Sequence, residues 1–306
     1  TYYYQNYTMQ KSTWINDGQG QYYMSADGTP AKGWMTFPEG RYYLDASTGK
    51  MATDWQQLDG AWYFFDPSGT MATGWRDVNG ARYYMDGEGR MQTGWQDIDG
   101  ARYYLDGSGR MTTGWQNLDG ASYYLGTDGK MQTGWVAHGL WYYFDPDTGA
   151  PAKGWKELNH TMYYFDESNG YMVTGRRTID DEEYCFNSDG SMHTGWYKEI
   201  NKWADDNSDC IDFLYFDPDG KLHKKWLTVD GKTYWTGDYG YVAKSYPDRY
   251  ESIAFRKIDG YLYGFDENGV MLTGYQQSVD KRTGKTADYF FDEQGRQDPD
   301  HTGWIE

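Results

Sequence analysis

The sequence predicts an all-β protein, an elongated solenoid of about thirteen stacked β-hairpins built from repeats of roughly 20–30 residues. Three observations carry this prediction: a tryptophan that recurs at constant spacing, an abundance of aromatic residues and glycine, and a shortage of aliphatic residues. Aromatic residues form 19% of the 306 residues, yet the mean hydropathy is -0.94. Short strands joined by tight turns are therefore expected in place of a conventional aliphatic core.

The tryptophan series defines the repeat and the domain organisation. From Trp55 to Trp155 a tryptophan stands at every twentieth position, and all but the first follow a glycine. After Trp155 the steps become unequal, and 30 residues separate Trp196 from Trp226. We therefore expect regular 20-residue repeats over residues 1–195 and irregular repeats with insertions over residues 196–306, which continue the same solenoid.

Each element of the repeat has a local signal, as residues 94–115 show. Trp95 to Ile98 form a short strand, and Asp99-Gly100 is a hairpin turn, because glycine tolerates the positive φ that this turn needs. Residues 102–105 are the return strand, and residues 106–109 form a second turn that leads to the next Gly-Trp pair. The repeated aspartates are expected to form turns, because an active site does not need a nearly identical carboxylate in every repeat.

Alternation along the return strand separates two faces of the hairpin. Arg102 and Tyr104 share one face, whereas Tyr103 and Leu105 share the other. A lone hairpin of this size is marginal in water, but stacked hairpins bury a continuous aromatic ladder. Trp95, Tyr103 and Leu105 are therefore expected to form the stacking surface.

Charge and motif content exclude several classes of function. The net charge of -18 argues against a nucleic-acid partner and against adsorption to anionic lipid, and no segment is apolar over the length of a transmembrane helix. The five histidines are scattered, and no nucleophile elbow, phosphate loop or dinucleotide motif is present. Catalytic carboxylates paired only by folding would leave no sequence motif, but no segment predicts a globular domain with a substrate cleft. We expect neither catalysis nor a cofactor.

Two acidic segments and two cysteines raise the questions of a calcium site and of a disulfide. The acidic segments 145–147 and 205–209 lack the glycine and terminal glutamate of an EF-hand loop, so solvated loops are expected and no metal site. Cys185 and Cys210 lie in neighbouring repeats. They form either a disulfide or two free thiols in aromatic surroundings, and we favour the free thiols.

The aromatic residues have a structural and a functional interpretation. Most are expected to fill the core of the solenoid. Rings left over in the grooves between hairpins could bind a quaternary ammonium group by cation–π interaction, at about 0.5–2 kcal/mol for each good contact. The same rings could stack on sugars, and either kind of weak site gains avidity from repetition.

The iterated pattern Gly-Trp…Asp-Gly-x-x-Tyr-Tyr-x-Asp-x-x-Gly-x-Met-x-Thr-Gly-Trp resembles the choline-binding, or cell-wall-binding, repeats of Gram-positive surface proteins. The resemblance covers essentially the whole chain. It implies a secreted, non-catalytic module at the bacterial cell surface that binds choline on teichoic-acid-type polymers, without membrane insertion. Related repeats in streptococcal glucosyltransferases and clostridial toxins bind polysaccharide or oligosaccharide, so a glycan ligand is the alternative. A structural adhesin stalk is a third interpretation.

The resemblance also names candidate ligand-binding residues. Each cage in these relatives uses the Gly-Trp tryptophan, an aromatic residue just before the Tyr-Tyr pair, an aromatic residue from the next hairpin, and often a methionine. Carried over to this chain, the choline cage candidates are Trp55, Trp62, Met71 and Tyr84 in one groove, Trp135, Trp141, Tyr164 and Met172 in another, and Trp196 with Phe213.

Several repeats depart from this pattern, because arginine replaces the second aromatic residue. A positive side chain there would oppose choline, but it could donate hydrogen bonds to sugar hydroxyls or simply pair with a nearby carboxylate in solvent. The alternative glycan contacts are Trp75, Arg82, Trp95, Arg102 and Trp115. The irregular part of the chain could instead bind a protein, and its insertion at residues 201–212 would be central to that.

Overall fold

The computed structural model describes residues 3–202, 209–246, 251–280 and 283–305, with side chains through residue 300. Over these ranges the chain forms thirteen two-stranded antiparallel sheets and one three-stranded sheet, and it contains no helix. The described residues accordingly include no helix that is long and apolar enough to cross a membrane. The all-β solenoid of stacked hairpins predicted from the sequence is confirmed.

Contacts divide the chain into two compact units, which are described separately. The first comprises Thr1–Val136 and Tyr143–Pro151, and the second comprises Ala137–Tyr142 and Ala152–Glu306. This division concerns contacts, not the regularity of the repeats. The change from regular to irregular repeats at residue 195 therefore stays a prediction.

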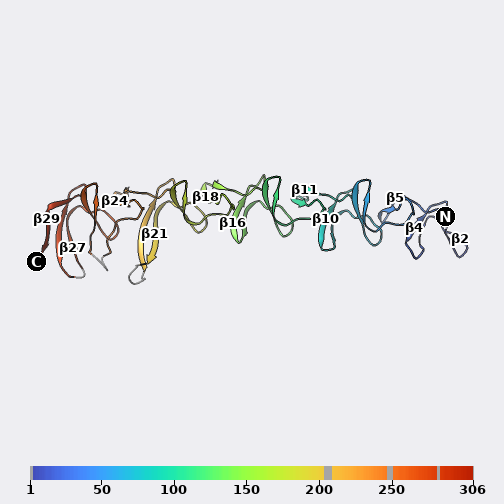
Figure 1. Ribbon diagram of the computed structural model, residues 1–306, viewed down its shortest axis with the longest axis horizontal. Coiled ribbons are helices and arrows are strands. Elements are labelled where there is room, and N and C mark those ends of the chain that lie inside the picture. The colour runs from blue at the N-terminus through green and yellow to red at the C-terminus, as the bar shows by residue number, and fades with distance from the viewer. Residues whose placement is uncertain (1–2, 203–208, 247–250, 281–282, 306) are drawn as a thin grey trace. The chain divides into compact units, whose positions relative to one another are not determined.

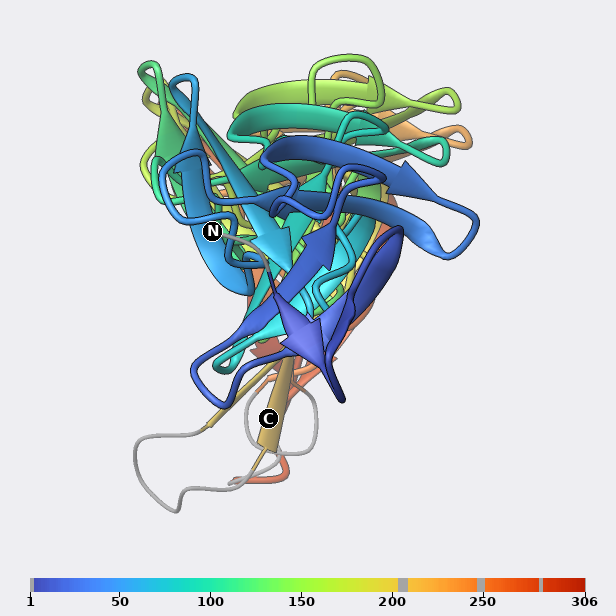
Figure 2. The ribbon, with the colours of Figure 1, turned by 90° about the vertical axis from the view of Figure 1, so that its right-hand side faces the viewer.

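Hairpins follow one another along the first unit (Figure 1), and in Figure 2 those coloured blue to green point in different directions. Its strands are β1 (Tyr4–Gln5), β2 (Thr8–Met9), β3 (Thr13–Asn16), β4 (Gln21–Met24), β5 (Gly33–Phe37), β6 (Gly40–Leu44), β7 (Asp54–Leu58), β8 (Ala61–Phe65), β9 (Gly74–Val78), β10 (Ala81–Met85), β11 (Gly94–Ile98), β12 (Ala101–Leu105), β13 (Gly114–Leu118) and β14 (Ala121–Leu125). The division between the units falls within β15 (Gly134–His138) and β16 (Leu140–Phe144).

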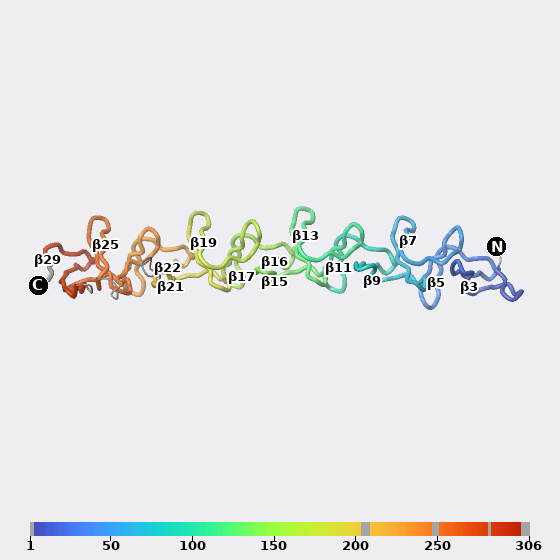
Figure 3. The backbone as a smooth tube through the Cα atoms, turned by 60° about the horizontal axis from the view of Figure 1, so that its bottom comes forward, coloured from blue at the N-terminus to red at the C-terminus, as the bar shows by residue number. Residues whose placement is uncertain are grey.

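The second unit continues the succession of hairpins, which Figure 3 traces from β17 to β25. It ends in the three-stranded sheet β27–β28–β29. Its strands are β17 (Gly154–Leu158), β18 (Thr161–Phe165), β19 (Gly175–Ile179), β20 (Glu182–Phe186), β21 (Gly195–Lys202), β22 (Asp209–Phe216), β23 (Trp226–Val229), β24 (Lys232–Trp235), β25 (Ala254–Ile258), β26 (Tyr261–Phe265), β27 (Gly274–Val279), β28 (Thr286–Phe291) and β29 (Gln297–Ile305).

The β11/β12 hairpin shows how the sequence produces the fold. Trp95 pairs with Tyr104, and Ile98 pairs with Ala101, which leaves a two-residue loop. The loop residues Asp99 and Gly100 have φ values of 50° and 78°. Positive φ at both positions is the signature of the type I′ turn, whose twist matches that of the strands.

Burial follows the predicted alternation. Leu105 is 0% exposed and Tyr103 is 8% exposed, whereas Arg102 on the opposite face is exposed. The last residue of most return strands is fully buried in this way, so each hairpin contributes one large side chain to the core. These residues are Met24, Leu44, Phe65, Met85, Leu105, Leu125 and Phe144, followed by Phe165, Phe186, Phe216, Phe265 and Phe291.

Aspartates stabilise the second turn of most repeats, as expected. The Asp106 carboxylate accepts hydrogen bonds from the backbone N–H groups of Ser108 at 2.8 Å and Arg110 at 3.0 Å. Asp145 does the same for residues 147 and 148. Most of the acidic segment 205–209 lies outside the described residues, among which no group of three potential metal-ligand side chains occurs.

The segment after each hairpin connects successive hairpins by backbone hydrogen bonds. Met111 forms a bridge with Leu105 in its own hairpin, while its N–H donates to the carbonyl of Arg82 in the preceding hairpin at 2.7 Å. The methionine side chains then pack on a glycine in the following turn, as Met91 does on Gly109. Each hairpin is thus stabilised by its neighbours, as in other repeat proteins.

The two cysteines are free thiols. Cys185 is buried in a cluster with Leu214, Phe216 and Leu222, and burial raises the pKa of its thiol. Cys210 is partly buried. Between the two alternatives that the sequence left open, the structure therefore has the free thiols.

The methionine–glycine contact can be separated from backbone strain by two substitutions. A Cβ at Gly109 (φ 82°) would lie 2.4 Å from the sulfur of Met91, whereas a Cβ at Gly100 (φ 78°) would meet nothing within 4 Å. We expect Gly100→Ala to lose about 1 kcal/mol for the left-handed backbone. Gly109→Ala should lose about 1–3 kcal/mol more, because Met91 must move. Urea unfolding of both variants checks this, and equal losses would contradict a role for the contact.

Candidate functional site

Most of the Gly-Trp tryptophans join two hairpins. The ring of Trp75 packs edge-on against Tyr84 of its own hairpin, with centroids 5.1 Å apart, and against Tyr103 of the next hairpin at 4.9 Å. Trp95 repeats the arrangement with Tyr104 at 5.2 Å and Tyr123 at 4.9 Å. The tryptophan is therefore structural in every such repeat, and only its remaining face is available for another partner.

A groove opens beside Trp55, where the return strand adds a second tryptophan. Trp55 and Trp62 lie with centroids 6.5 Å apart and planes at 83°, and Tyr83 of the next hairpin lies 4.9 Å from Trp55. Trp62 is 42% exposed, so one wall of the groove faces solvent. The groove has a volume of about 460 Å³ and is lined by Trp55, Trp62, Tyr83, Met91, Gly107, Ser108 and Arg110.

This arrangement corrects the third ring of the first predicted cage. Tyr84 lies on the same face of its hairpin as Trp75 and packs against that ring. Tyr83, one residue earlier, points to the opposite face, which packs against the preceding hairpin and reaches Trp55. A shift of one residue along a strand moves a side chain to the other face, so Tyr83 stands where Tyr84 was expected.

The methionine of the first cage also differs from the prediction. Met71 is tied to the preceding hairpin, because its N–H donates to the carbonyl of Arg41. Met91 is tied to Trp62 in the same way at 2.8 Å and lines the groove. Counting one repeat further along the chain would have identified Met91. Ser108 and Arg110 were missed because they come from the turn two repeats after Trp62.

The second predicted cage is brought together in part. Met172 donates its N–H to the carbonyl of Trp141 at 2.7 Å, and Trp141 is 50% exposed. Tyr164 instead packs against Trp155 at 5.2 Å. Trp135 belongs to the first unit and Trp141 to the second, so a cage that joins them stays a prediction.

The third predicted pair, Trp196 and Phe213, already has a cation nearby. Trp196 packs against Tyr215 of its own hairpin and Tyr234 of the next. The Lys244 ammonium lies 5.2 Å from the centroid of the Phe213 ring. Burial lowers the pKa of Lys244. Lys244 lies closer to the Tyr246 ring, at 4.2 Å, so Phe213 is one of two rings beside this cation.

The arginines of the alternative glycan interpretation occupy the tryptophan faces of their hairpins. The Arg82 guanidinium lies 5.2 Å from the centroid of Trp75 and forms an ion pair with Asp77 at 3.6 Å. The corresponding distances are 5.0 Å from Arg102 to Trp95 and 3.7 Å to Asp97, and Arg41 lies 4.2 Å from Trp34. In these hairpins one of the protein's own cations therefore lies beside the tryptophan ring.

Trp115, the remaining glycan candidate, lies in a hairpin without such an arginine. Ser122 stands at the second position and donates its hydroxyl to Asn117 at 2.7 Å. Trp115 is 40% exposed and packs against Tyr124 and Phe144. This hairpin therefore has one tryptophan where the β7/β8 hairpin has two.

Arg176 replaces the tryptophan of the β19/β20 hairpin and builds an ionic cluster there. Its guanidinium forms ion pairs with Glu183 and Glu199 and donates a hydrogen bond to the Tyr241 hydroxyl at 3.0 Å. Glu183 stands at the second aromatic position, so both cage residues of this hairpin are charged. The position is closed to a cationic ligand by internal pairing.

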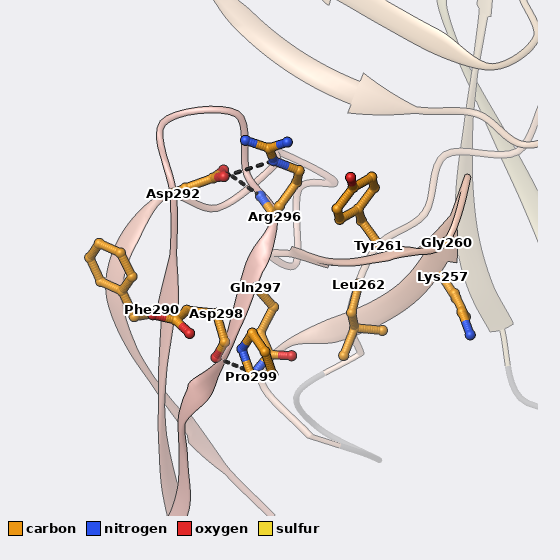
Figure 4. A pocket seen from close by; sticks show the side chains of 10 residues that line it. All are labelled: Lys257, Gly260, Tyr261, Leu262, Phe290, Asp292, Arg296, Gln297, Asp298 and Pro299. Carbon is orange, nitrogen blue, oxygen red and sulfur yellow. Dashed lines mark hydrogen bonds and ion pairs between the residues drawn. The ribbon is translucent and has the colours of Figure 1, made fainter.

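A larger hollow of about 680 Å³ lies between β26 and β29 in the second unit (Figure 4). Tyr261 and Leu262 form one side of it, and the lining residues with described side chains include no tryptophan. Arg296 lies 5.2 Å from the centroid of the Tyr261 ring and forms an ion pair with Asp292 at 2.7 Å. This hollow therefore also contains its own cation and is not an aromatic cage.

Comparisons with known proteins agree with the geometry of the first unit. The family model described as the choline-binding repeat matches residues 52–91, 72–113 and 112–153. The solved structure of CbpJ from Streptococcus pneumoniae TIGR4 is 26% identical, with a TM-score of 0.56, over 85% of this chain and 99% of that chain. No curated protein gives a significant match.

Choline binding protein F from Streptococcus pneumoniae is also similar. One crystal form is 26% identical, with a TM-score of 0.52, over 85% of this chain and 98% of that one. Its structure in the presence of a peptidoglycan analogue, a tetrasaccharide-pentapeptide, has the same identity and coverage and a TM-score of 0.53.

The ionic cluster makes stability depend on pH. Partial burial would raise the pKa of Glu199, but hydrogen bonds from Tyr241 and Arg176 outweigh it and lower that pKa. A lowered pKa in the folded state stabilises the fold above the unfolded pKa of about 4.3, and this contribution is lost as pH falls further. We expect Glu199→Gln to lose about 1–2 kcal/mol at pH 7 and to approach the wild type in acid. Urea unfolding at several pH values measures this. The exposed Glu88→Gln is the control, and parallel pH curves would contradict the assignment.

Proposed function

The chain belongs to the choline-binding repeat family, and on that premise we propose that it is a cell-wall-binding module whose hairpin grooves hold choline groups of a surface polymer. The observation that carries the proposal is the groove of Trp55, Trp62 and Tyr83. Trp55 meets Trp62 at 83° and Tyr83 at 64°, so the three rings form the sides of a corner and not a flat stack. Such a corner presents several electron-rich faces to one ligand.

The chemistry of this corner suits a quaternary ammonium group. The methyl groups of trimethylammonium spread its positive charge over an apolar surface. The group has no N–H to donate in a hydrogen bond, and aromatic ring faces attract it. Each good contact contributes about 0.5–2 kcal/mol, so a single groove should bind choline at about millimolar concentration. The sulfur and methylene groups of Met91 supply a soft apolar side to the same groove.

Occupancy is expected to differ between grooves. At Arg82 and Arg102, which stand at the second position, the guanidinium lies over the tryptophan and forms an ion pair with an aspartate. Where tryptophan stands there, as at Trp62 and Trp141, the ring is exposed, and at Trp62 it lines the groove. Choline should therefore occupy the tryptophan grooves and avoid the arginine grooves. The engagement of Arg82 and Arg102 also argues against their use as donors to sugar hydroxyls.

The natural partner follows from weak sites in series. A polymer that carries many choline groups engages several grooves at once and is retained although each site is weak. We propose choline-bearing teichoic acid of the bacterial cell wall as this polymer and the cell surface as the location. The chain would itself be non-catalytic, since stacked hairpins with open grooves offer binding surfaces in place of an enclosed reaction site.

Removing the exposed tryptophan should remove one site. We expect Trp62→Ala to reduce the number of choline molecules bound per chain by one, with the fold retained because Trp62 lies outside the buried core. Ser122→Ala changes the equivalent position of a hairpin without a second tryptophan and should leave the number unchanged. Equilibrium dialysis with labelled choline up to tens of millimolar measures both. A wild-type chain that binds no choline over this range would contradict the proposed function.

Introducing the residues of the Trp62 hairpin into the Arg82 hairpin should create a choline-binding site. Trp62 stands opposite Gln57 on the neighbouring strand, whereas Arg82 stands opposite Asp77. We expect the double variant Asp77→Gln, Arg82→Trp to bind one additional choline, because the new ring replaces the internal cation. The single variant Asp77→Gln is the control and should gain nothing. An unchanged number of sites in a correctly folded double variant would show that the arginine does not control occupancy.

A further inference from the structure

The hollow between β26 and β29 lies where the succession of hairpins gives way to the terminal sheet. Arg296 forms an isolated bridge with Tyr263, as Lys130 does with Tyr103 in a regular repeat. In the regular repeats a methionine follows and packs on the glycine of the next turn. Here Gln297 takes that position and begins β29, which pairs with β28. Within the described residues this is the one three-stranded sheet, so the hollow has a wall that the other hairpins lack.

Tyr261 is an aromatic residue at a position that several other hairpins fill with alanine. It stands opposite Ile258 at the end of the β25/β26 hairpin, as Ala101 stands opposite Ile98 in the β11/β12 hairpin. The hairpins β7/β8, β9/β10 and β13/β14 also have alanine there. The hairpin therefore does not need so large a side chain for its own packing. Because Tyr261 is 52% exposed and lines the hollow, its ring is accessible to a ligand.

Arg296 is held in place beside this ring. Its guanidinium lies 5.2 Å from the centroid of the Tyr261 ring. Its Nε donates to the Asp292 carboxylate at 2.7 Å (Figure 4), and its Nη2 donates to the side-chain carbonyl of Gln294 at 3.1 Å. A guanidinium carries five N–H donors in one plane, so donors remain for a ligand. Since the side chain is already ordered, binding a ligand costs little further side-chain entropy.

The charges around the hollow balance one another. Among the lining residues with described side chains, Lys257 and Arg296 are positive, whereas Asp292 and Asp298 are negative. A strongly charged ligand would meet like charges as well as opposite ones, and like charges brought together in a site are costly. A hydroxyl group both donates and accepts hydrogen bonds. A neutral ligand with several hydroxyl groups can therefore use both kinds of side chain.

Apolar surface lies between these polar groups. Tyr261 and Leu262 come from β26, while Phe290 and Pro299 come from β28 and β29 (Figure 4). A sugar ring has the same mixed character, because C–H groups cover its faces and hydroxyl groups surround its rim. Its C–H face can lie on an aromatic ring while the hydroxyl groups reach the charged side chains. The volume of about 680 Å³ is typical of a small-molecule site and suits a short oligosaccharide.

This part of β29 is poorly suited to bind a peptide as an added strand. Such binding uses the N–H and C=O groups along the edge of a strand. The Asp298 carbonyl accepts a hydrogen bond from the Gln297 side chain at 2.9 Å, and Pro299 has no N–H to donate. A peptide is therefore less favoured than a sugar as the occupant of the hollow.

We propose that the hollow between β26 and β29 is a second binding site of this protein and takes a neutral oligosaccharide. Tyr261 stacks on a sugar ring, Arg296 donates hydrogen bonds to the sugar hydroxyl groups, and the carboxylates that line the hollow accept hydrogen bonds from them. The site uses none of the residues of the Trp55–Trp62–Tyr83 groove. It is therefore independent of choline binding.

The test measures retention of the full chain on an array of neutral oligosaccharides built from hexoses and N-acetylhexosamines. Saturating choline is present, so that sugars do not stack in the choline grooves. We expect retention on at least one class of these oligosaccharides. Calorimetry with tetra-alanine tests the peptide alternative. No retention on the array, or binding of tetra-alanine in place of sugar, would overturn the proposal without affecting the conclusion on choline.

Substitutions assign the binding to the hollow. Tyr261→Ala introduces the residue of the regular hairpins and should weaken binding to the retained oligosaccharide about tenfold, the order of one aromatic contact. Tyr261→Phe keeps the ring and should retain most of the affinity, whereas Arg296→Gln removes the charged donor and should weaken it. Tyr239→Ala is the control, because this tyrosine is 81% exposed and does not line the hollow.

Choline binding, measured by equilibrium dialysis, should be the same in all four variants, which shows that the chain remains folded. Undiminished sugar binding in both Tyr261→Ala and Arg296→Gln would overturn the assignment to this hollow. An equal loss in Tyr261→Ala and Tyr239→Ala would also contradict it.

Discussion

The structure depends on the packing of one tryptophan between two hairpins. Most Gly-Trp rings touch an aromatic ring of their own return strand and one of the next hairpin, as Trp95 touches Tyr104 and Tyr123. A two-stranded hairpin has too little surface to bury its own aromatic face. The contact supplies the missing cover, so every hairpin needs its neighbour and the chain folds as a series of nearest-neighbour pairs.

The ligand groove is a consequence of this packing. Because the tryptophan edges are used by the tyrosines, a face remains at the groove, and that face attracts a cation. Arg82 and Arg102 provide the cation from within the chain, whereas Trp62 leaves the place open and adds a wall. The cation–π interaction at the tryptophan face is therefore made either with an arginine of the chain or with a ligand. One residue in each return strand decides which of the two occurs.

The predicted cages show which parts of the site could be derived from the sequence. The tryptophans Trp55 and Trp62 were identified correctly as neighbours, because both belong to one hairpin whose register is set by its turn. Tyr84 was expected where Tyr83 lies, since the face that meets the preceding hairpin is not a property of one hairpin. Arg110 comes from a turn two repeats away, and no local pattern relates it to Trp62.

The sequence by itself determined the repeat, the strands and turns, and the residue at each second position, because spacing and turn chemistry act over a few residues. It also distinguished hairpins with arginine from those with tryptophan. Only the tertiary structure decided which tyrosine closes a groove, which methionine lines it, and which turn supplies its edge. The reason is that these contacts are set by how one hairpin packs on the next. A shift of one residue changes the face that is presented, and the side chains that meet are separated by one or two repeats.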